Sequence, residues 1–192
     1  MKKEKLMEYA EKFVDSEVLP RCHLEIIEEI NRHKKEGRMV ILNTASPDIY
    51  PAIISKRLGF DDYRATRFIL EEKSPLFIRI DGKNNKRFEK LLSMSDLLPP
   101  EYSAKILSHE YKYQIPDADP VIKNSWAYSD STADLPMLLL SENKILVNPV
   151  SSQLKDTAHE KLWDIVNPGK CREAFCRYGQ MLLQILGLFP LI

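Results

Sequence analysis

Apolar residues follow a helical repeat through the first part of the chain. Over residues 2–19 they recur at spacings of three and four: Leu6, Tyr9, Ala10, Phe13 and Val14. This spacing predicts a helix that Pro20 interrupts. A second helix is predicted from Leu24 to Lys35, and Gly37 is a natural stop behind it.

From residue 39 the pattern changes to short apolar runs that alternate with helical segments. Residues 39–42 (Met-Val-Ile-Leu) form a continuous run, which is typical of a strand buried on both faces. The polar turn 43–47 follows it, and then a predicted helix over residues 50–58 that Gly59 closes. Further strands are predicted over residues 63–69, 76–80, 125–128, 144–147 and 162–166. Further helices are predicted over residues 85–95, 134–141, 151–161 and from Cys171 onward.

Repeated strand–turn–helix units with short connections predict an α/β fold, with a parallel sheet and helices on both faces. We assign residues 37–168 to this α/β core, residues 1–36 to a helical segment and residues 169–192 to a helical apolar tail. The proline-containing stretch 96–122 is predicted to be an irregular excursion within the core, with a helix near residues 101–110.

Composition narrows the class of protein. The chain has 192 residues, of which 44% are apolar and 29% charged, as in a folded domain with its own core. Its 28 basic residues equal its 28 acidic ones. We therefore expect no nucleic acid partner, because phosphate backbones attract a positive surplus. Three cysteines without CxxC spacing fit neither a disulfide framework nor a zinc site, and they favour a cytoplasmic location.

We expect neither a signal peptide nor a membrane-spanning helix. The basic N-terminus is not followed by the apolar segment of a signal peptide. The apolar stretch 181–192 has about half of the roughly 20 residues that a spanning helix needs. We expect this stretch to dock on the core, and contact with a membrane surface or a partner protein is the alternative.

Polar residues beyond the carboxyl ends of parallel strands form the sites of such sheets, which directs attention to Thr44, Asp130 and Asp134. The two aspartates can converge on one hard cation, and they can equally cap the helix that follows. The Thr44 hydroxyl and the next backbone N–H groups can bind a phosphoryl group or act as an N-cap. The residues alone leave both choices open. Lys90, taken by itself, is typical of a surface lysine.

Taken in order, three segments resemble the haloacid dehalogenase (HAD) superfamily, and within it the phosphoserine-phosphatase-like subfamily. They are V-I-L-N-T-A-S-P at 40–47, R-I-D-G-K-N at 79–84 with Glu89-Lys90 behind it, and A-Y-S-D-S-T-A-D-L-P-M-L at 127–138. The resemblance covers roughly residues 12–167. It implies a Rossmann-like parallel sheet with a helical cap, and residues 1–36 would then be part of the cap.

The resemblance implies a Mg²⁺-dependent hydrolase that cleaves a small phosphorylated substrate through an aspartyl-phosphate. The phosphate-binding positions carried over from the family are Thr44, Ala45, Ser46 and Lys90. The metal-binding positions are Asp130 and Asp134. Thr44 and Lys90 would also contact the transferring group during catalysis. A hydroxyl, a lysine and a magnesium ion suit the negative charge of a phosphoryl group in transfer, so we expect these side chains to share one pocket.

The printed sequence lacks the family's first motif, an apolar strand that ends in D-x-D-G-T. In the family, the first aspartate of this motif attacks phosphorus, and the second protonates the leaving group and then activates water. The D-x-D at 117–119 follows Ile115-Pro116 and no apolar strand, so we interpret it as a loop. We expect this chain alone to be inactive and to bind Mg²⁺ weakly.

Several interpretations of the absent first motif stay open. The chain is a pseudophosphatase, a piece of a longer phosphatase, or half of a split enzyme. The absent strand lies mid-sheet in the family, so its neighbours would pair with each other, with the C-terminal segment, or with a strand from a second chain. Self-association and strand complementation are therefore the expected modes of partnership. The alternative functions are a non-catalytic binding or scaffold module, and contact with a membrane or partner through the apolar tail.

Overall fold

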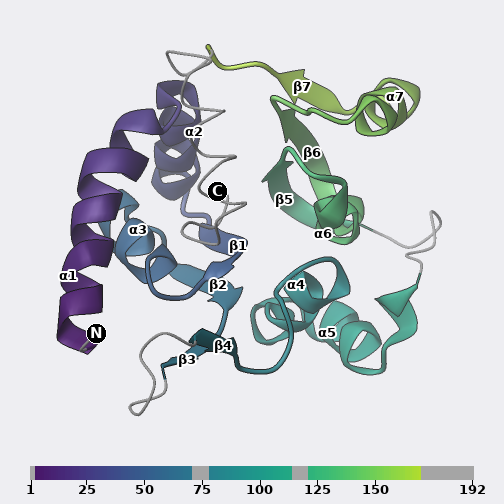
Figure 1. The fold of residues 1–192 in the computed structure, drawn as a ribbon. Helices are drawn as coiled ribbons and strands as arrows, with labels where there is room; N and C mark the ends of the chain where they lie inside the picture. Colours follow the sequence, from purple (N-terminus) through teal and green to yellow (C-terminus); the bar gives the residue numbers. More distant parts are fainter. Residues whose placement is uncertain (1–2, 71–77, 114–120, 170–192) are drawn as a thin grey trace. The chain divides into compact units, whose positions relative to one another are not determined.

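The computed structural model describes residues 3–70, 78–113 and 121–169. The chain forms two compact units, the first reaching to Asn85 and the second running from Lys86 to Pro168 (Figure 1). Both units combine helices with parallel strands, so the predicted α/β fold class is confirmed. The predicted last helix, the apolar tail and the D-x-D at 117–119 lie outside the described residues, and the division into cap and core stays a prediction.

Helical backbone covers the start of the first unit. α1 (Lys3–Phe13) continues into a π-helical turn (Val14–Val18) and a 3₁₀ turn (Leu19–Arg21). The predicted helix is confirmed over residues 3–19, although its hydrogen bonding changes at Val14, and Pro20 does not interrupt it because a 3₁₀ turn continues to Arg21. α2 (Leu24–Lys35) has the predicted bounds.

The rest of the first unit is one further helix and two pairs of strands. α3 (Pro51–Leu58) ends at Gly59, whose φ of +68° is the left-handed conformation that favours glycine. The strands are β1 (Ile41–Pro47), β2 (Asp62–Thr66), β3 (Phe68–Leu70) and β4 (Ile78–Ile80). β1 pairs with β2 in parallel, and β3 pairs with β4 antiparallel.

Two strand predictions in this unit were wrong in their bounds. β1 begins at Ile41 and runs through the polar turn 43–47, which was expected to end it. The single strand predicted over residues 63–69 is divided between β2 and β3, with Arg67 between them. At this residue the chain leaves the parallel strand pair β1–β2 and enters the antiparallel strand pair β3–β4. The predicted single strand therefore contributes to two sheets.

One apolar cluster joins α1, the π-helical turn and α3. Its buried members are Ala10, Val14, Val18, Tyr50, Ile53 and Ile54. At its edge the Arg57 guanidinium donates to both oxygens of Asp15, at 2.9 and 3.0 Å. This bidentate hydrogen bonding holds the pKa of the Asp15 carboxyl below its usual value.

The second unit follows the predicted order of elements. In chain order these are α4 (Phe88–Leu92), α5 (Pro100–Leu107), β5 (Ile122–Ser129), α6 (Leu135–Leu140), β6 (Ser141–Val147), α7 (Ser152–Glu160) and β7 (Asp164–Val166). Short 3₁₀ turns lie at Ser95–Leu97, Glu110–Lys112 and Thr132–Asp134. The helix expected near residues 101–110 is present as α5. α4 is shorter than predicted, and β6 begins at Ser141 instead of Lys144.

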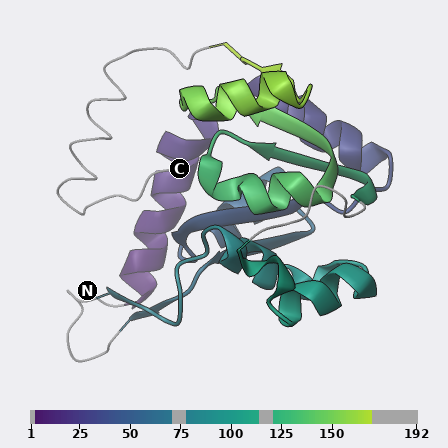
Figure 2. The same ribbon diagram turned by 90° about the vertical axis from the view of Figure 1, so that its right-hand side faces the viewer.

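The sheet of the second unit has the order β5-β6-β7, with all strands parallel. Its core is a cluster of residues from the sheet, α6 and α7: Ala127, Leu138, Leu146, Leu154 and Ala158. Figure 2 shows these two helices beside the strands. Among residues 3–70, 78–113 and 121–169, no helix combines the length and the apolar character needed to cross a membrane.

Truncation of Leu138 is expected to destabilise the second unit. Its side chain is fully buried in the cluster, so Leu138→Ala should lower the free energy of unfolding by about 2–5 kcal/mol. Leu162, which is 90% exposed, provides the matched control, and Leu162→Ala should change it by less than about 0.5 kcal/mol. Urea unfolding followed by tryptophan fluorescence measures both, because Trp126 and Trp163 lie in this unit. Equal losses in the two variants would contradict the assigned core.

Stability is expected to depend on pH through His33, a buried residue of α2. Burial, and then the charges of Arg32 and Arg38, lower the pKa of His33 below 6.5, while Glu29 opposes them. The neutral ring suits its contact with Arg38, whose Nη1 lies 3.2 Å from Nδ1.

As pH falls through 6.5, the unfolded chain takes up a proton that the folded protein takes up only at lower pH. The free energy of unfolding should therefore fall in this window, whereas above it both states are neutral and His33 contributes no pH dependence. Urea unfolding of the wild type and His33→Gln, followed by circular dichroism between about pH 5 and pH 8, measures the effect. In His33→Gln the free energy of unfolding should fall less steeply as pH decreases below 6.5. The same dependence on pH in both proteins would show that His33 is not its source.

Candidate functional site

β1 carries the predicted phosphate-binding turn as a bulge in its ladder with β2. Asn43 pairs with Arg64, but the next pair is Pro47 with Thr66, so three residues of β1 stand opposite one residue of β2. The three residues are Thr44, Ala45 and Ser46. A bulge takes backbone groups out of the ladder, and those that are buried need other partners.

Two side chains from outside β1 supply those partners. The Nδ2 group of Asn85 donates to the Thr44 carbonyl at 2.9 Å and to Asn43 Oδ1 at 2.8 Å. The Thr66 hydroxyl donates to the Ala45 carbonyl at 2.7 Å, and the Asn85 backbone N–H donates to Thr66 Oγ1 at 3.0 Å. Asn85 and Thr66 are both buried. Two consecutive carbonyls of the bulge are therefore fixed by hydrogen bonds.

The Thr44 hydroxyl is left able to donate. Its oxygen accepts the Ser46 backbone N–H at 3.1 Å, and no acceptor for its own proton is found among the described residues. A hydroxyl has one proton and two lone pairs, so this proton can go to an oxygen of a bound anion. The side chain of Ser46 is buried, so this residue contributes through its backbone.

In the second unit a buried ion pair joins two of the predicted site residues. Lys90 lies in α4, a short helix in which Phe88 and Leu91 are also buried. Its Nζ lies 2.7 Å from Asp134 Oδ1, and the two side chains are 7% and 11% exposed. Two charges in an interior need close geometry and further hydrogen bonds to offset the loss of water around them.

Both carboxylate oxygens of Asp134 are engaged. Its Oδ2 accepts the Ser129 hydroxyl at 2.7 Å, while Oδ1 faces Lys90. The Ser129 oxygen in turn accepts the Ser131 backbone N–H at 3.1 Å. Asp134 thus holds Lys90 in place. Asp130, directly after β5, is exposed, and its carboxylate has no hydrogen bond or ion pair in the described part of the chain.

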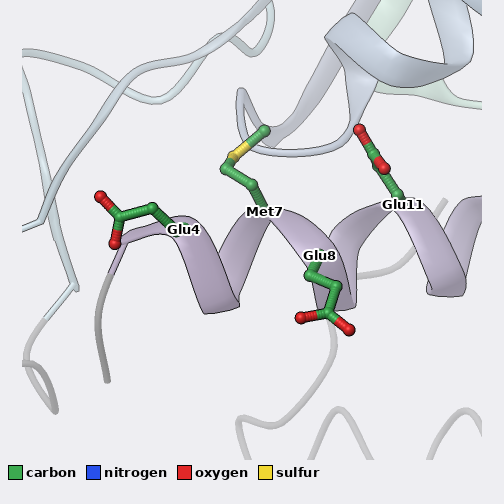
Figure 3. Close-up of a pocket in the computed structure, with 4 residues that line it drawn as sticks. All are labelled: Glu4, Met7, Glu8 and Glu11. Carbon is green, nitrogen blue, oxygen red and sulfur yellow. The ribbon is translucent and has the colours of Figure 1, made fainter.

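A pocket on α1 has a different character. It is lined by Glu4, Met7, Glu8 and Glu11 (Figure 3). Three carboxylates on one helix repel a phosphate dianion. Lys12 lies 2.7 Å from Glu8, and Arg57 interacts with the charge of Glu11. This pocket therefore does not suit phosphoryl binding, and none of the predicted site residues lines it.

Comparison with known proteins assigns the family. The sequence model of haloacid dehalogenase-like hydrolases (HAD) matches residues 1–139. The chain belongs to the HAD family. A search of curated proteins finds no match to the sequence of this HAD chain.

One solved structure shows the same kind of fold. A protein of unknown function from Bordetella pertussis Tohama I is 21% identical to this HAD chain and superposes with a TM-score of 0.68, covering 88% of this chain and 69% of its own. A probable phosphoserine phosphatase from Vibrio cholerae is 13% identical, with a TM-score of 0.49, and the match covers 84% of this chain and 43% of that one. A phosphoserine phosphatase in its apo form is 18% identical, with a TM-score of 0.46 and coverages of 85% and 64%. At 21% identity, the first match shows a shared fold and not a shared activity.

Members of the HAD family generally depend on Mg²⁺. The described residues do not fit this ion by themselves, because no group of three or more potential ligands among histidine, cysteine, aspartate and glutamate is present in them. Asp134 already has a partner on each oxygen, and Asp130 alone would leave most of an octahedral shell to water. That Asp130 binds Mg²⁺ stays a prediction.

The predicted site residues fall into two groups. Thr44, Ala45 and Ser46 belong to the first unit, and Lys90, Asp130 and Asp134 belong to the second. The structure brings Lys90 and Asp134 into contact, whereas the expectation of one shared pocket stays a prediction.

Sequence reasoning missed the residues that support these groups, namely Asn85, Thr66 and Ser129. A serine at 129 and paired asparagines at 84–85 are visible in the sequence, but nothing in it indicates where their side chains point.

Removing one partner of the buried ion pair is expected to destabilise this HAD chain more than removing both. Asp134→Leu leaves the Lys90 ammonium buried without that carboxylate, which should cost about 3–5 kcal/mol of the free energy of unfolding. In the double variant Lys90→Met/Asp134→Leu no charge of the pair remains buried, so the loss should be smaller. Urea unfolding followed by tryptophan fluorescence measures both variants. A double variant less stable than Asp134→Leu would show that the pair itself stabilises the fold.

Proposed function

We propose that this HAD-family chain is a phosphatase-like hydrolase that binds the phosphoryl group of a small phosphorylated substrate, and that it does not turn substrate over without an added aspartate pair. The observation that carries the proposal is the buried Lys90–Asp134 contact. A lysine at the surface is free to move in solvent, whereas the carboxylate of Asp134 holds buried Lys90 in one position. A lysine held in the interior, next to the turn at the end of a parallel strand, is placed to offset negative charge there.

In the proposed reaction, each residue acts on the charge of the transferring group. The Thr44 hydroxyl donates its unused proton to a phosphoryl oxygen, and the Lys90 ammonium stabilises the negative charge that spreads over the others. Asp134 positions Lys90 and does not contact the substrate. Asp130 would be one ligand of a Mg²⁺ ion only together with further ligands from the added aspartate pair.

The nucleophile has to come from outside the printed sequence. In the family's chemistry, an aspartate carboxylate attacks phosphorus, the bond to the substrate oxygen breaks, and a second aspartate protonates the departing alcohol. Water then attacks the acyl phosphate and releases inorganic phosphate. The only D-x-D of the sequence is at 117–119, behind Ile115-Pro116, so we assign it no part in these steps.

Two strand edges support the idea that a further strand is added. Among the described residues, β1 pairs with β2 alone and β5 pairs with β6 alone. β1 carries no charged residue along its length, although charges are one common protection of an exposed edge. A strand that ends in D-x-D-G-T and binds at one of these edges would complete the catalytic set by β-augmentation.

A non-catalytic binding or scaffold module is the second candidate, and the same missing motif favours it. Such a module would bind the phosphorylated molecule without cleaving it, or present its surface to a partner. For either function we propose no nucleic acid partner, because the charges balance, and a cytoplasmic location, which the odd number of cysteines supports.

Hydrolysis of p-nitrophenyl phosphate in the presence of Mg²⁺ distinguishes the two candidates. The chain alone is expected to release no more p-nitrophenol than buffer does. Addition of a peptide that contains an apolar strand ending in D-x-D-G-T is expected to restore release. In the restored system Lys90→Met should reduce the rate by about 100-fold, because the developing charge loses its main cation.

A peptide with both aspartates changed to asparagine is the matched control, and it should restore nothing. Activity of the chain alone that Asp130→Asn abolishes would overturn the proposed inactivity. If the active peptide restores no hydrolysis but the chain binds phosphate, the binding module is favoured.

A further inference from the structure

The bulge of β1 is shaped by a residue that no comparison assigns. Asn85 lies in the loop after β4, and its side chain is 4% exposed. It contacts the bulge through its side chain, and it contacts Thr66, the second residue that holds the bulge, through its backbone. The two bulge carbonyls, of Thr44 and Ala45, are therefore held by Asn85 and by a residue that Asn85 contacts.

We infer that Asn85 is a positioning residue, which fixes the Thr44–Ser46 bulge in the shape that binds a tetrahedral oxyanion. The inference rests on the proposed function, because phosphate is the anion that this turn is proposed to bind. Asn85 does not contact the anion. It acts by setting the direction of two peptide groups and, through them, of the Thr44 hydroxyl.

The first peptide group is set directly by the Asn85 side chain. The Nδ2 amide has two protons, and they match two acceptors, Asn43 Oδ1 and the Thr44 carbonyl. A carboxylate of the same shape would place an acceptor against both oxygens, and an alanine would leave both without this donor. Asparagine is thus the side chain of this size that satisfies the bulge.

The second peptide group is set through Thr66. The Thr66 oxygen accepts the Asn85 backbone N–H, and its hydroxyl donates to the Ala45 carbonyl at 2.7 Å, which is a shorter contact than the 3.2 Å to Asn84 Oδ1. No cis peptide is present in the described chain, and a trans peptide carries its N–H opposite its carbonyl. The N–H of Ser46 therefore points away from Thr66, and it reaches the Thr44 hydroxyl oxygen.

The unused oxygen of Asn85 shows that the contacts of this side chain are made by its Nδ2 group. Asn85 Oδ1 is buried, and no hydrogen-bond partner for it is found among the described residues. A buried polar atom without a partner is unfavourable, so the amide carries a cost at Oδ1 while its Nδ2 group satisfies two acceptors. The two contacts of Nδ2 with the bulge explain why an amide is present in spite of that cost.

A titration with inorganic phosphate, followed by the backbone amide signals of Ala45 and Ser46 in ¹H–¹⁵N spectra, tests the inference. Asn85→Ala is expected to weaken phosphate binding by about tenfold, the equivalent of one net hydrogen bond. Asn31→Ala changes an exposed asparagine of α2 in the same unit and is the matched control, with binding expected within about twofold of the wild type. Thr44→Ala removes the donor to the anion and tests the proposed function itself.

The outcomes separate the two claims. If Thr44→Ala weakens phosphate binding and Asn85→Ala does not, the proposed function stands and the role of Asn85 is overturned. If the wild type gives no response to phosphate, the proposed function fails. Asn85 is then judged from spectra without phosphate, in which displaced Ala45 and Ser46 signals in Asn85→Ala, but not in Asn31→Ala, support the positioning role and unchanged signals overturn it.

Asn85→Asp keeps the inference testable where the alanine variant does not fold. At neutral pH its carboxylate cannot donate to the Thr44 carbonyl, so the Ala45 and Ser46 signals should be displaced as in Asn85→Ala. Acidification protonates the carboxyl and returns one donor, so the signals should move back toward their wild-type positions. Such a return would show that the donor at position 85 sets the bulge, and signals that stay displaced in acid would contradict the inference.

Discussion

A lysine ammonium in a protein interior depends on the carboxylate that faces it, and in the second unit this dependence organises the site. Lys90 lies in a helix of only five residues, and its partner Asp134 lies in the turn after β5. Ser129, the last residue of β5, fixes the other oxygen of that carboxylate. The end of the strand, the turn and α4 are therefore held together by one carboxylate, and Asp130 is left at the surface with its oxygens unused.

The first unit solves a related problem for backbone groups. A bulge in β1 takes carbonyls out of the ladder, and they accept hydrogen bonds from the side chain of Asn85 and from the side chain of Thr66, the last residue of β2. In both units, polar groups at the end of a parallel strand make their hydrogen bonds or ion pairs with side chains. These groups are the bulge carbonyls in the first unit and the Asp134 carboxylate in the second. Each arrangement leaves one group with spare capacity: the hydroxyl of Thr44 and the carboxylate of Asp130.

The spacing of apolar residues and the position of glycines along the chain were enough to predict helix bounds. The spacing of apolar residues predicted α2 with its bounds, and Gly59 predicted the end of α3. Motif order pointed to Lys90 and Asp134, which are in contact in the structure. The extent of β1 could not be predicted, because its bulge is satisfied by Thr66 and Asn85, which lie 21 and 41 positions away from the residues they hold. The role of Ser129 depends on the direction of a hydroxyl, which residue type does not determine.

In the π-helical turn after α1, the number of residues is restricted more strictly than their identity. Each residue of an α-helix turns the next by about 100°, so one residue more or less rotates everything that follows. Val14 and Val18 lie in the core at the two ends of this turn, and Asp15 reaches Arg57 from it. Exposed Ser16 tolerates many side chains, since only its own hydroxyl binds locally, to the Lys12 carbonyl. Deletion of that same residue would swing the following segment off α3, so natural variation here should consist of substitutions and not of gaps.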